Sequence, residues 1–450
     1  MRELVKSSLS FACAMPLLGA RQLGHWLAPT AERQRMAASG LDAVARAATH
    51  GIEQQGFLGW LYQAGSCAEA AMVQVVPTLL TPQLLSPAAW ADVAAAVAAR
   101  SAVAARQLAA GQGPLAMELL RSKAEVFCLV LDVSKLIGVP DAPPFPLAEL
   151  LAKAYALGDF KALWAVEGLG KAYGDSFWAQ GVTPDAILRD ARTGGLPARS
   201  LTMLDAGIGL SFAKYLLTGA GTRTPEPELR ARVREIVRLC RANARPGYVG
   251  AALESLGLVT RTFHAQRVAA VDQILRQTAP EVLGYFWHGV GRAIFFDPVN
   301  FLPGSDGLVF EMAASEGPDE AAKLNAVAGA AWAYVLVAQR NPRILAELVI
   351  EPHGERLAES GAFANGLQSS TMMRQDTTPG APFIAAFLAY RPSPANPRLV
   401  RLWDQLVRIP GEAALHVYYP VIRDHDRLGD IFEYRDLPAF VARLGGRAAA

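Results

Sequence analysis

Apolar positions along most of the chain recur three and four residues apart, which is the spacing of one face of an α-helix. Residues 89–110, rich in alanine, are typical of this pattern. Proline and glycine clusters separate the apolar runs, and we interpret each cluster as a helix end or a turn. The pattern predicts an all-α protein whose helices are joined by short connections.

One segment near the C-terminus departs from the helical pattern. Residues 414–422 are rich in aromatic and β-branched side chains, which are enriched in strands. We expect these residues to form a strand that pairs with residues 430–434 in a small β-hairpin.

Two stretches of the chain repeat one pattern of aromatic, polar and glycine residues. Residues 163–172 and 284–293 both end in Gly-x-Gly, a cation and alanine, about 120 residues apart. Residues 204–213 match residues 324–333 at nearly the same separation. Two matches at one offset predict an internal duplication. We therefore expect two copies of one helical unit, packed about a pseudo-twofold axis.

The duplication divides the chain into four expected parts. They are an N-terminal helical segment (residues 1–110), a first repeat unit (111–220), a second repeat unit (221–345) and a C-terminal helical cap (346–450). Glycine inside a helix costs about 1 kcal/mol relative to alanine, yet glycines stand at matching points of both units. We expect these glycines to let neighbouring helices cross closely.

Two glycine-rich segments also resemble nucleotide-binding loops. Residues 168–174 resemble a dinucleotide-binding loop, whose glycines bring backbone amides close to a pyrophosphate. Residues 204–209 resemble the first motif of S-adenosylmethionine-dependent methyltransferases, a glycine loop that follows a strand. Helix packing is the simpler interpretation of both segments. The methyltransferase stays open as an enzyme alternative, and no cofactor is assigned.

Composition narrows the class of protein. Hydrophobic residues make up 52% of the 450 residues and charged residues 19%, so most of the chain has a core to bury. The net charge of +2 excludes a globally basic nucleic-acid binder. The four cysteines include no Cys-x-x-Cys pair, which favours a reduced, cytoplasmic compartment. The seven histidines show no spacing typical of a helical metal site, and no metal site is predicted.

Two apolar segments bear on membrane association. Residues 326–338 form the longest apolar run, which is too short to span a bilayer and fits a buried core helix. Residues 1–20 imitate a signal peptide, but an acidic residue and a proline interrupt the pattern. We interpret them as an amphipathic helix that docks on the body of the protein or on a lipid surface. Membrane association of a cytoplasmic protein therefore stays open.

The main site hypothesis concerns charges in apolar surroundings. His288 and Arg292 stand four residues apart, on one face of a predicted helix. The matching positions of the first unit hold Glu167 and Lys171. Because buried charges are costly unless they are paired, we expect Glu167 or Lys171 to pair with His288 or Arg292 across the repeat interface. The alternative is a core histidine that bonds a carbonyl, Asp205 or Glu167.

Aromatic residues concentrate on the same two segments. Core packing explains most of them, but rings beside closely packed helices also wall apolar cavities that hold small molecules. We expect a long apolar small molecule to bind between the two repeat units. The residues expected to line this site are Trp164, Glu167, Lys171, Trp287, His288, Arg292 and Phe296. No catalytic residue is assigned.

A second candidate surface consists of arginines at helical spacing. Their guanidinium groups share one side of a predicted helix, which suits an anionic membrane or an acyl-carrier protein. A solvated helix face is the simpler interpretation. The arginines are Arg230, Arg234, Arg238, Arg241 and Arg245.

The chain also resembles a known family. Its paired glycine units, together with residues 362–367, are similar to an uncharacterised domain family encoded beside enediyne and other polyketide biosynthetic genes in bacteria. The resemblance spans about residues 160–370 and implies a place near polyketide or lipid-like metabolism. No catalytic residue of that family is established, so none is carried over.

Three functions remain open at this stage. The first is an accessory protein of secondary or lipid-like metabolism that binds an apolar small molecule. The second is an enzyme, either a methyltransferase that uses residues 204–209 or an acid–base catalyst centred on His288. The third is a peripheral membrane or scaffold protein, and a homodimer is open as well.

Overall fold

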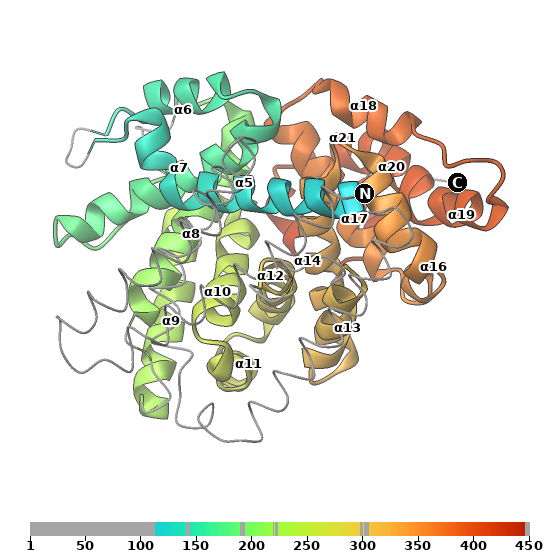
Figure 1. Cartoon of the computed structure of the whole chain (residues 1–450). Coiled ribbons are helices and arrows are strands. Elements are labelled where there is room, and N and C mark those ends of the chain that lie inside the picture. Colours follow the sequence, from blue (N-terminus) through green and yellow to red (C-terminus); the bar gives the residue numbers. More distant parts are fainter. Residues whose placement is uncertain are drawn as a thin grey trace, which may run out of the picture. The chain divides into compact units, whose positions relative to one another are not determined.

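The computed structural model describes residues 113–140, 145–189, 194–218, 220, 224–297, 300 and 306–445. All of these residues belong to one compact unit of the chain, residues 75–450. Within the described ranges every regular element is a helix, which confirms the all-α prediction (Figure 1). The opening helix expected in residues 1–20 lies outside the described residues.

Six helices form the centre of the fold, and each packs along the next (Figure 1). We call this set the central array, and its internal positions are almost all buried because its helices are apolar on most sides. The helices are α7 (Asp159–Ala179), α8 (Leu201–Leu217), α10 (Val249–Phe263), α12 (Leu283–Phe295), α14 (Glu320–Ala338) and α17 (Ala362–Thr377).

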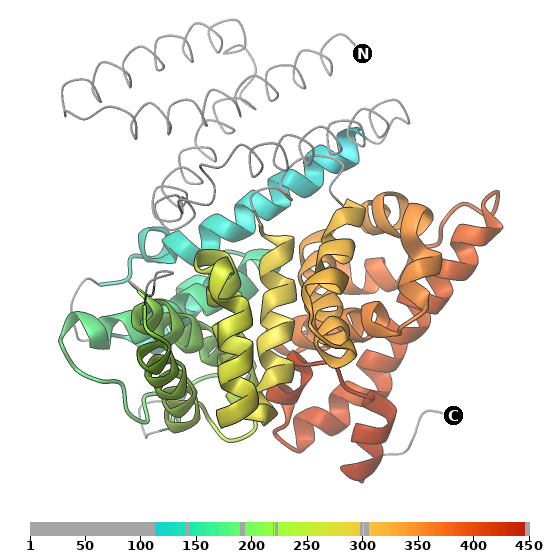
Figure 2. The same cartoon turned by 90° about the horizontal axis from the view of Figure 1, so that it is seen from below.

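The other helices cover the central array. Helix α5 (Gly113–Ile137) packs against both α7 and α14 and runs across one side of the array (Figure 2). The remaining helices are α6 (Leu147–Ala156), α9 (Glu226–Asn243), α11 (Val268–Thr278), α13 (Asp306–Glu316), α15 (Pro342–Leu345), α16 (Glu351–Ala358), α18 (Pro382–Ala389), α19 (Pro397–Trp403), α20 (Ile409–Ala413), α21 (Tyr419–Asp424) and α22 (Leu437–Arg443).

The central array curls until its ends meet. The rings of Trp164 on α7 and Trp332 on α14 make an edge contact at 6.2 Å between centroids. At the seam, the buried Arg374 of α17 donates hydrogen bonds to the carbonyls of Asp159 and Phe160, where α7 begins. Side chains of α7, α10, α12 and α14 therefore meet in the interior of the curl.

Where two helices of the central array cross, each contributes a four-residue segment, X-x-x-Gly. The glycine of one segment faces the backbone carbonyl of residue X in the other. Where α7 crosses α8, a Cβ atom on Gly170 would lie 2.4 Å from the carbonyl oxygen of Leu204. A Cβ atom on Gly207 would lie 2.1 Å from the carbonyl oxygen of Glu167. Only a hydrogen atom fits in such a space, so the two backbones touch at this crossing.

The same reciprocal contact recurs where α10 crosses α12 and where α12 crosses α14. The glycines and the residues whose carbonyls they face are Gly257 with Phe286, Gly289 with Glu254, Gly291 with Ala326, and Gly329 with His288. Between α8 and α10 a serine replaces one glycine: Gly209 faces the carbonyl of Ala252, and Ser255 Oγ donates to the carbonyl of Ala206 at 2.9 Å. The expected role of the glycines in close helix crossing is confirmed.

These crossings refine the sequence repeat. By packing, Gly329 corresponds to Gly207, not to Gly209 as the sequence offset suggests. The α7–α8 and α12–α14 crossings match each other, as a duplication requires, but the α10–α12 crossing has the same form. The pattern thus belongs to the whole central array, and the duplication with its four expected parts stays a prediction.

The predicted C-terminal hairpin is wrong. Residues 414–422 belong to a continuous helical stretch that runs from Pro397 to Asp424, and residues 428–432 form a 3₁₀ helix. The aromatic and branched side chains that suggest a strand are used for burial, as at Tyr418, Tyr419 and Ile422. Tertiary packing outweighs local strand preference here, since that preference depends strongly on context.

Prolines inside the C-terminal helices are accommodated by widened turns. A proline ring lacks the N–H donor and clashes with the carbonyl four residues earlier. A π turn directly before each proline-bearing segment gives that carbonyl room. The π turns are Ala346–Ile350, Asp404–Arg408 and Ala414–Tyr418, and the prolines that follow them are Pro352, Pro410 and Pro420.

Helix α14 carries the longest apolar run of the sequence. It is the one described helix that is long and apolar enough to cross a membrane, but 83% of its most apolar window is buried inside the protein. Its neighbours on both sides are helices of the central array. The prediction that residues 326–338 form a buried core helix is confirmed.

Candidate functional site

The interior of the curl holds a buried ionic network of four side chains, which we call the central network. Arg292 Nη2 lies 2.5 and 2.6 Å from the two carboxylate oxygens of Glu167. Arg292 Nη1 donates to Glu254 Oε2 at 3.1 Å, and His288 Nδ1 lies 3.1 Å from Glu254 Oε1. Each of the four residues is at most 2% exposed.

Three helices contribute to the central network, and the glycine crossings align them. Glu167 and Glu254 each occupy the X position of an X-x-x-Gly crossing, as does His288. Because the helix backbones nearly touch at these positions, side chains of α7, α10 and α12 lie close enough to form hydrogen bonds and ion pairs with one another. Arg292 stands one turn after His288 and bonds both carboxylates.

Burial and pairing set the protonation of the two glutamates. Burial raises the pKa of Glu167, and the charge and hydrogen bonds of Arg292 oppose this shift. Burial also acts on Glu254, but Arg292 and His288 outweigh it, so the pKa of Glu254 lies below its ordinary value. The Arg292 guanidinium keeps its charge, since both carboxylates raise its pKa against desolvation. Glu254 is therefore the firmly ionised carboxylate of the central network.

Aromatic rings enclose the central network. The Arg292 guanidinium lies 4.7 Å from the centroid of the Trp332 ring, which gives a cation–π contact. Trp332 also contacts the rings of His288 and Phe432, and Trp164 makes an edge contact with Phe296. The charges therefore lie within an apolar wall, where electrostatic interactions are stronger than in water.

Four buried polar atoms in this region have no hydrogen-bond partner in the described part of the chain. They are His288 Nε2, Arg292 Nε, Trp164 Nε1 and Trp332 Nε1. At least three of them are N–H donors. Buried polar atoms in proteins nearly always bond to protein or to ordered water. The central network therefore has unused donor capacity that suits an oxygen atom of a guest molecule or water.

The structure brings together four of the seven residues that the sequence assigns to this site, and Phe296 adjoins them through Trp164. Of the predicted pairings, that of Glu167 with Arg292 is present. Two residues lie elsewhere. Lys171 pairs with Asp175 at 2.6 Å on a half-buried face of α7, and Trp287 Nε1 donates to Asp272 Oδ1 at 2.8 Å.

Glu254 is the functional candidate that sequence reasoning missed. It is a single carboxylate within the apolar run of α10, and every described neighbour from Gly250 to Gly257 is buried. An isolated acidic residue inside an apolar helix is the signal that could have found it. The alternative in which Asp205 bonds His288 is wrong, since the side chain that faces His288 Nδ1 is Glu254.

The glycine-loop interpretations are wrong. Residues 168–174 lie within α7 and residues 204–209 lie within α8, so neither segment is a loop at the start of a helix. Their backbone amides are used inside the helices, and Gly168, Gly170, Gly207 and Gly209 face the backbones of neighbouring helices. The methyltransferase alternative loses the motif on which it depends.

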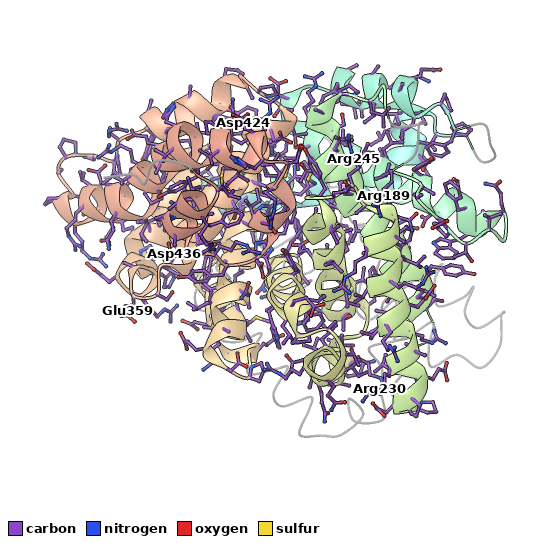
Figure 3. All side chains as sticks on the ribbon, turned by 180° about the vertical axis from the view of Figure 1, so that it is seen from behind. Arg189, Arg230, Arg245, Glu359, Asp424 and Asp436 are labelled. Carbon is purple, nitrogen blue, oxygen red and sulfur yellow. The ribbon has the colours of Figure 1, made fainter. Side chains whose placement is uncertain are left out.

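Four of the five predicted stripe arginines, Arg230, Arg234, Arg238 and Arg241, lie on α9, but Arg245 follows the end of this helix. Figure 3 shows Arg230 near the start of α9 and Arg245 beyond its C-terminal end. Arg230 pairs with Glu226, Arg238 with Glu235, and Arg241 with Glu281. These ion pairs support the solvated-face interpretation for three of the five arginines, and an anionic partner of the stripe stays a prediction.

Within the described ranges, no group of three or more histidine, cysteine, aspartate or glutamate side chains is arranged to hold a metal ion. Cys240 is buried and forms no disulfide with a described residue. Burial raises the pKa of its thiol to about 12. No family model, curated protein or solved structure matches this chain.

Proposed function

We propose that this chain binds an apolar small molecule and holds the molecule's oxygen-bearing group at the central network. The proposal rests on one observation: buried polar atoms of His288, Arg292, Trp164 and Trp332 have no hydrogen-bond partner among the described residues and lie beside aromatic rings. Ligand sites of small molecules commonly combine apolar walls with a few fixed polar groups.

The chemistry of the donors indicates the kind of group they would hold. Indole and guanidinium N–H groups only donate, so their partner is an acceptor such as a carbonyl or ether oxygen. The carboxylates of the two glutamates already offset the single charge of Arg292, and more than offset it when both are ionised, which disfavours a further carboxylate at this place. A neutral, carbonyl-bearing molecule therefore fits best. A role in secondary or lipid-like metabolism agrees with such a ligand and stays part of the proposal.

Mass spectrometry of the purified protein tests this function. We expect native spectra of the wild-type chain to show a bound small molecule that organic extraction recovers. Trp332→Phe keeps an aromatic ring, though a smaller one, and removes the N–H donor, so the bound fraction should fall about tenfold. Trp403→Phe is the matched control, because Trp403 Nε1 is also buried without a partner but lies on α19 against Phe387 and Tyr390. Equal occupancy in both variants contradicts the proposal.

A second candidate function, acid–base catalysis, is favoured by the orientation of His288. Its Nδ1 faces Glu254, while its Nε2 has no described partner. A carboxylate that fixes one ring nitrogen and leaves the other available is the arrangement of a general base. If wild-type protein converts the extracted molecule and His288→Gln only binds it, the enzyme interpretation replaces simple binding.

A further inference from the structure

The central network is closed off from solvent, since its four side chains are each at most 2% exposed. A molecule that binds there must pass between two helices that separate for a time. The way in which each junction of the curl is closed therefore decides where such a molecule enters.

Five junctions around the curl are closed by backbone contact. The four from α7 to α14 have the X-x-x-Gly crossings described above. Between α14 and α17, a Cβ atom on Gly366 would lie 2.1 Å from the carbonyl oxygen of Ala328. The seam, where α7 meets α14 and α17, differs. Its described glycines face other neighbours, since those of α7 face α5 and α8, and side chains close the seam instead.

Arg374 of α17 closes the seam from the inside. Its side chain is fully buried, and its guanidinium donates to the carbonyl oxygens of Asp159 at 3.1 Å and Phe160 at 3.2 Å, where α7 begins. It also donates to the carbonyl oxygen of Leu336 at 3.5 Å and to Gln339 Oε1 at 3.3 Å, where α14 ends. One side chain thus joins the start of α7 to the end of α14.

The charge of Arg374 is unfavourable in this closed position. In the described part of the chain, each of its hydrogen-bond acceptors is a neutral oxygen. Burial, together with the charge of Arg340, lowers the pKa of Arg374 to about 9. Water would hydrate this guanidinium if the seam separated, which offsets the carbonyl bonds that are lost. Opening of the seam should therefore need less free energy than opening of a glycine crossing.

The seam lies directly beside the central network. Phe160 stands one turn before Trp164 on α7, and Leu336 stands one turn after Trp332 on α14. One helical turn is about 5.4 Å long. The two tryptophan rings contact each other, and neither Nε1 atom has a hydrogen-bond partner among the described residues. A molecule that passes Arg374 therefore reaches the tryptophan pair next.

An exposed contact closes the same seam on the solvent side. Glu125 of α5 pairs with Lys161 of α7 at 3.4 Å and with Arg340, which follows α14, at 2.8 Å. The Arg340 guanidinium also lies 3.6 Å from the centroid of the Phe160 ring. The Lys161 and Arg340 side chains are 45% and 38% exposed, so these ion pairs add little stability. Glu125 therefore joins the same two helices as Arg374, but weakly.

We propose that the seam is the gate through which an apolar molecule reaches the central network, opened when Arg374 exchanges its carbonyl partners for water. This gate rests on the function proposed above, because it supplies the entrance for that ligand. Arg374 and Glu125 hold the seam and not the ligand. Changes at these two positions should therefore alter the rates of entry and release by the same factor and leave the dissociation constant unchanged.

Hydrogen–deuterium exchange of the full chain tests whether the seam opens. Arg374→Lys keeps the charge but loses the planar fork that reaches two helices, so exchange at the start of α7 and the end of α14 should rise about tenfold. Glu125→Gln removes the outer contact and should raise exchange in the same two segments about threefold. Exchange in the middle of α10 should stay unchanged in both variants.

Glu355→Gln is the matched control for the exposed contact. Glu355 of α16 also pairs with two cations, Arg398 and Arg401 of α19, away from the seam. This variant should leave exchange at the start of α7 and the end of α14 as it is in the wild type. If neither Arg374→Lys nor Glu125→Gln raises exchange there, or if exchange rises equally in every helix of the central array, the gate is overturned.

Stopped-flow fluorescence connects opening with binding, and the probe is prodan, a neutral fluorescent naphthyl ketone. Arg374→Lys and Glu125→Gln should raise its association and dissociation rates together, whereas Trp332→Phe should raise its dissociation constant. Unchanged rates in seam variants whose exchange rises would show entry elsewhere and overturn the gate. Absence of prodan binding, or equal affinity of Trp332→Phe and wild type, contradicts the proposed binding at the central network instead.

Discussion

Burial decides how the charges of single residues act in this protein. Arg292 lies between two carboxylates and over an indole ring, with almost no exposure to water. An exposed pair such as Arg238 with Glu235 has solvent on most sides and contributes little. A buried pair adds little net stability when intact, but it is expensive to break.

Replacing Arg292 by methionine should destabilise the protein by about 3–5 kcal/mol, because Glu167 and Glu254 would remain buried without their cation. Denaturant unfolding near neutral pH measures this loss. The double variant Glu167→Gln with Arg292→Met should lose less than the sum of the single changes. Arg238→Met is the exposed control and should cost less than about 1 kcal/mol. A similar cost for Arg238→Met and Arg292→Met would refute the role of burial.

Asp376 makes a second residue-scale prediction, on pH. Its pKa is raised from 3.8 to about 6, so the folded protein keeps this proton to higher pH than the unfolded chain. The stabilising contribution is present in full below about pH 4 and is lost as the pH rises through about 6. Asp376→Asn should therefore be more stable than wild type by about 1–3 kcal/mol at neutral pH, and the difference should shrink in acid.

Asp404→Asn provides the control of opposite sign. A hydrogen bond from Arg408 lowers the pKa of Asp404, so this carboxylate stabilises the fold at neutral pH and loses its contribution in acid. Thermal unfolding of both variants across acidic to neutral pH compares them. A wild-type advantage over Asp376→Asn that grows with pH would contradict the raised pKa.

At the residue scale, the sequence predicted the site correctly where a charged residue interrupts an apolar run. The spacing of His288 and Arg292 and the repeat position of Glu167 led to the pairing that the structure contains. Glu254 and Asp376 were missed because their partners come from helices far away in the sequence. No local pattern indicates that Thr202 and Tyr419 approach Asp376, since this contact depends on the curl of the array.

At the scale of elements, glycine at the crossings determines how closely helices approach. Gly207→Ala would place a methyl group 2.1 Å from a backbone carbonyl that belongs to Glu167. Although alanine favours the helix by about 1 kcal/mol, overpacking against backbone costs more, and we expect a net loss of about 1–3 kcal/mol. Because Glu167 also bonds Arg292, the shift should weaken the central network.

The control for this prediction is Gly195→Ala. A Cβ atom there meets no described atom within 4 Å, so the stability of this variant should change by less than about 0.5 kcal/mol. Chemical denaturation of both variants gives the comparison. Equal stability of Gly207→Ala and wild type would show that the α7–α8 crossing has room to adjust.

The helices were predictable from periodicity, but the widened turns were not. Proline at positions 410 and 420 indicates helix ends by local rules, whereas the structure continues through both with π turns. The strand expected at 414–422 failed for the same reason, because its branched residues pack inward on that helix. Local propensity is informative only where tertiary packing does not override it.

At the scale of the whole molecule, the central array links helices that are far apart in the sequence. Arg292 binds Glu167 across 125 positions of the chain, and α8 packs on both α7 and α10. A fragment of residues 111–220 would lose the partner of Glu167 and expose the face of α8 that meets α10. We expect circular dichroism to show that this fragment is largely unfolded, whereas the full-length protein keeps its helices. A folded fragment would instead support an autonomous repeat unit.

The recurring X-x-x-Gly crossing also indicates how distant homologues of this protein could be recognised. Side chains around the array can drift as long as volume is conserved, but a position that touches a neighbouring carbonyl admits only glycine or, where a hydrogen bond compensates, serine. The spacing of small residues on successive helices should therefore be conserved in homologues whose overall sequence identity to this protein is low. A search of genome sequences for this spacing of small residues would therefore detect homologues that ordinary alignment scores overlook.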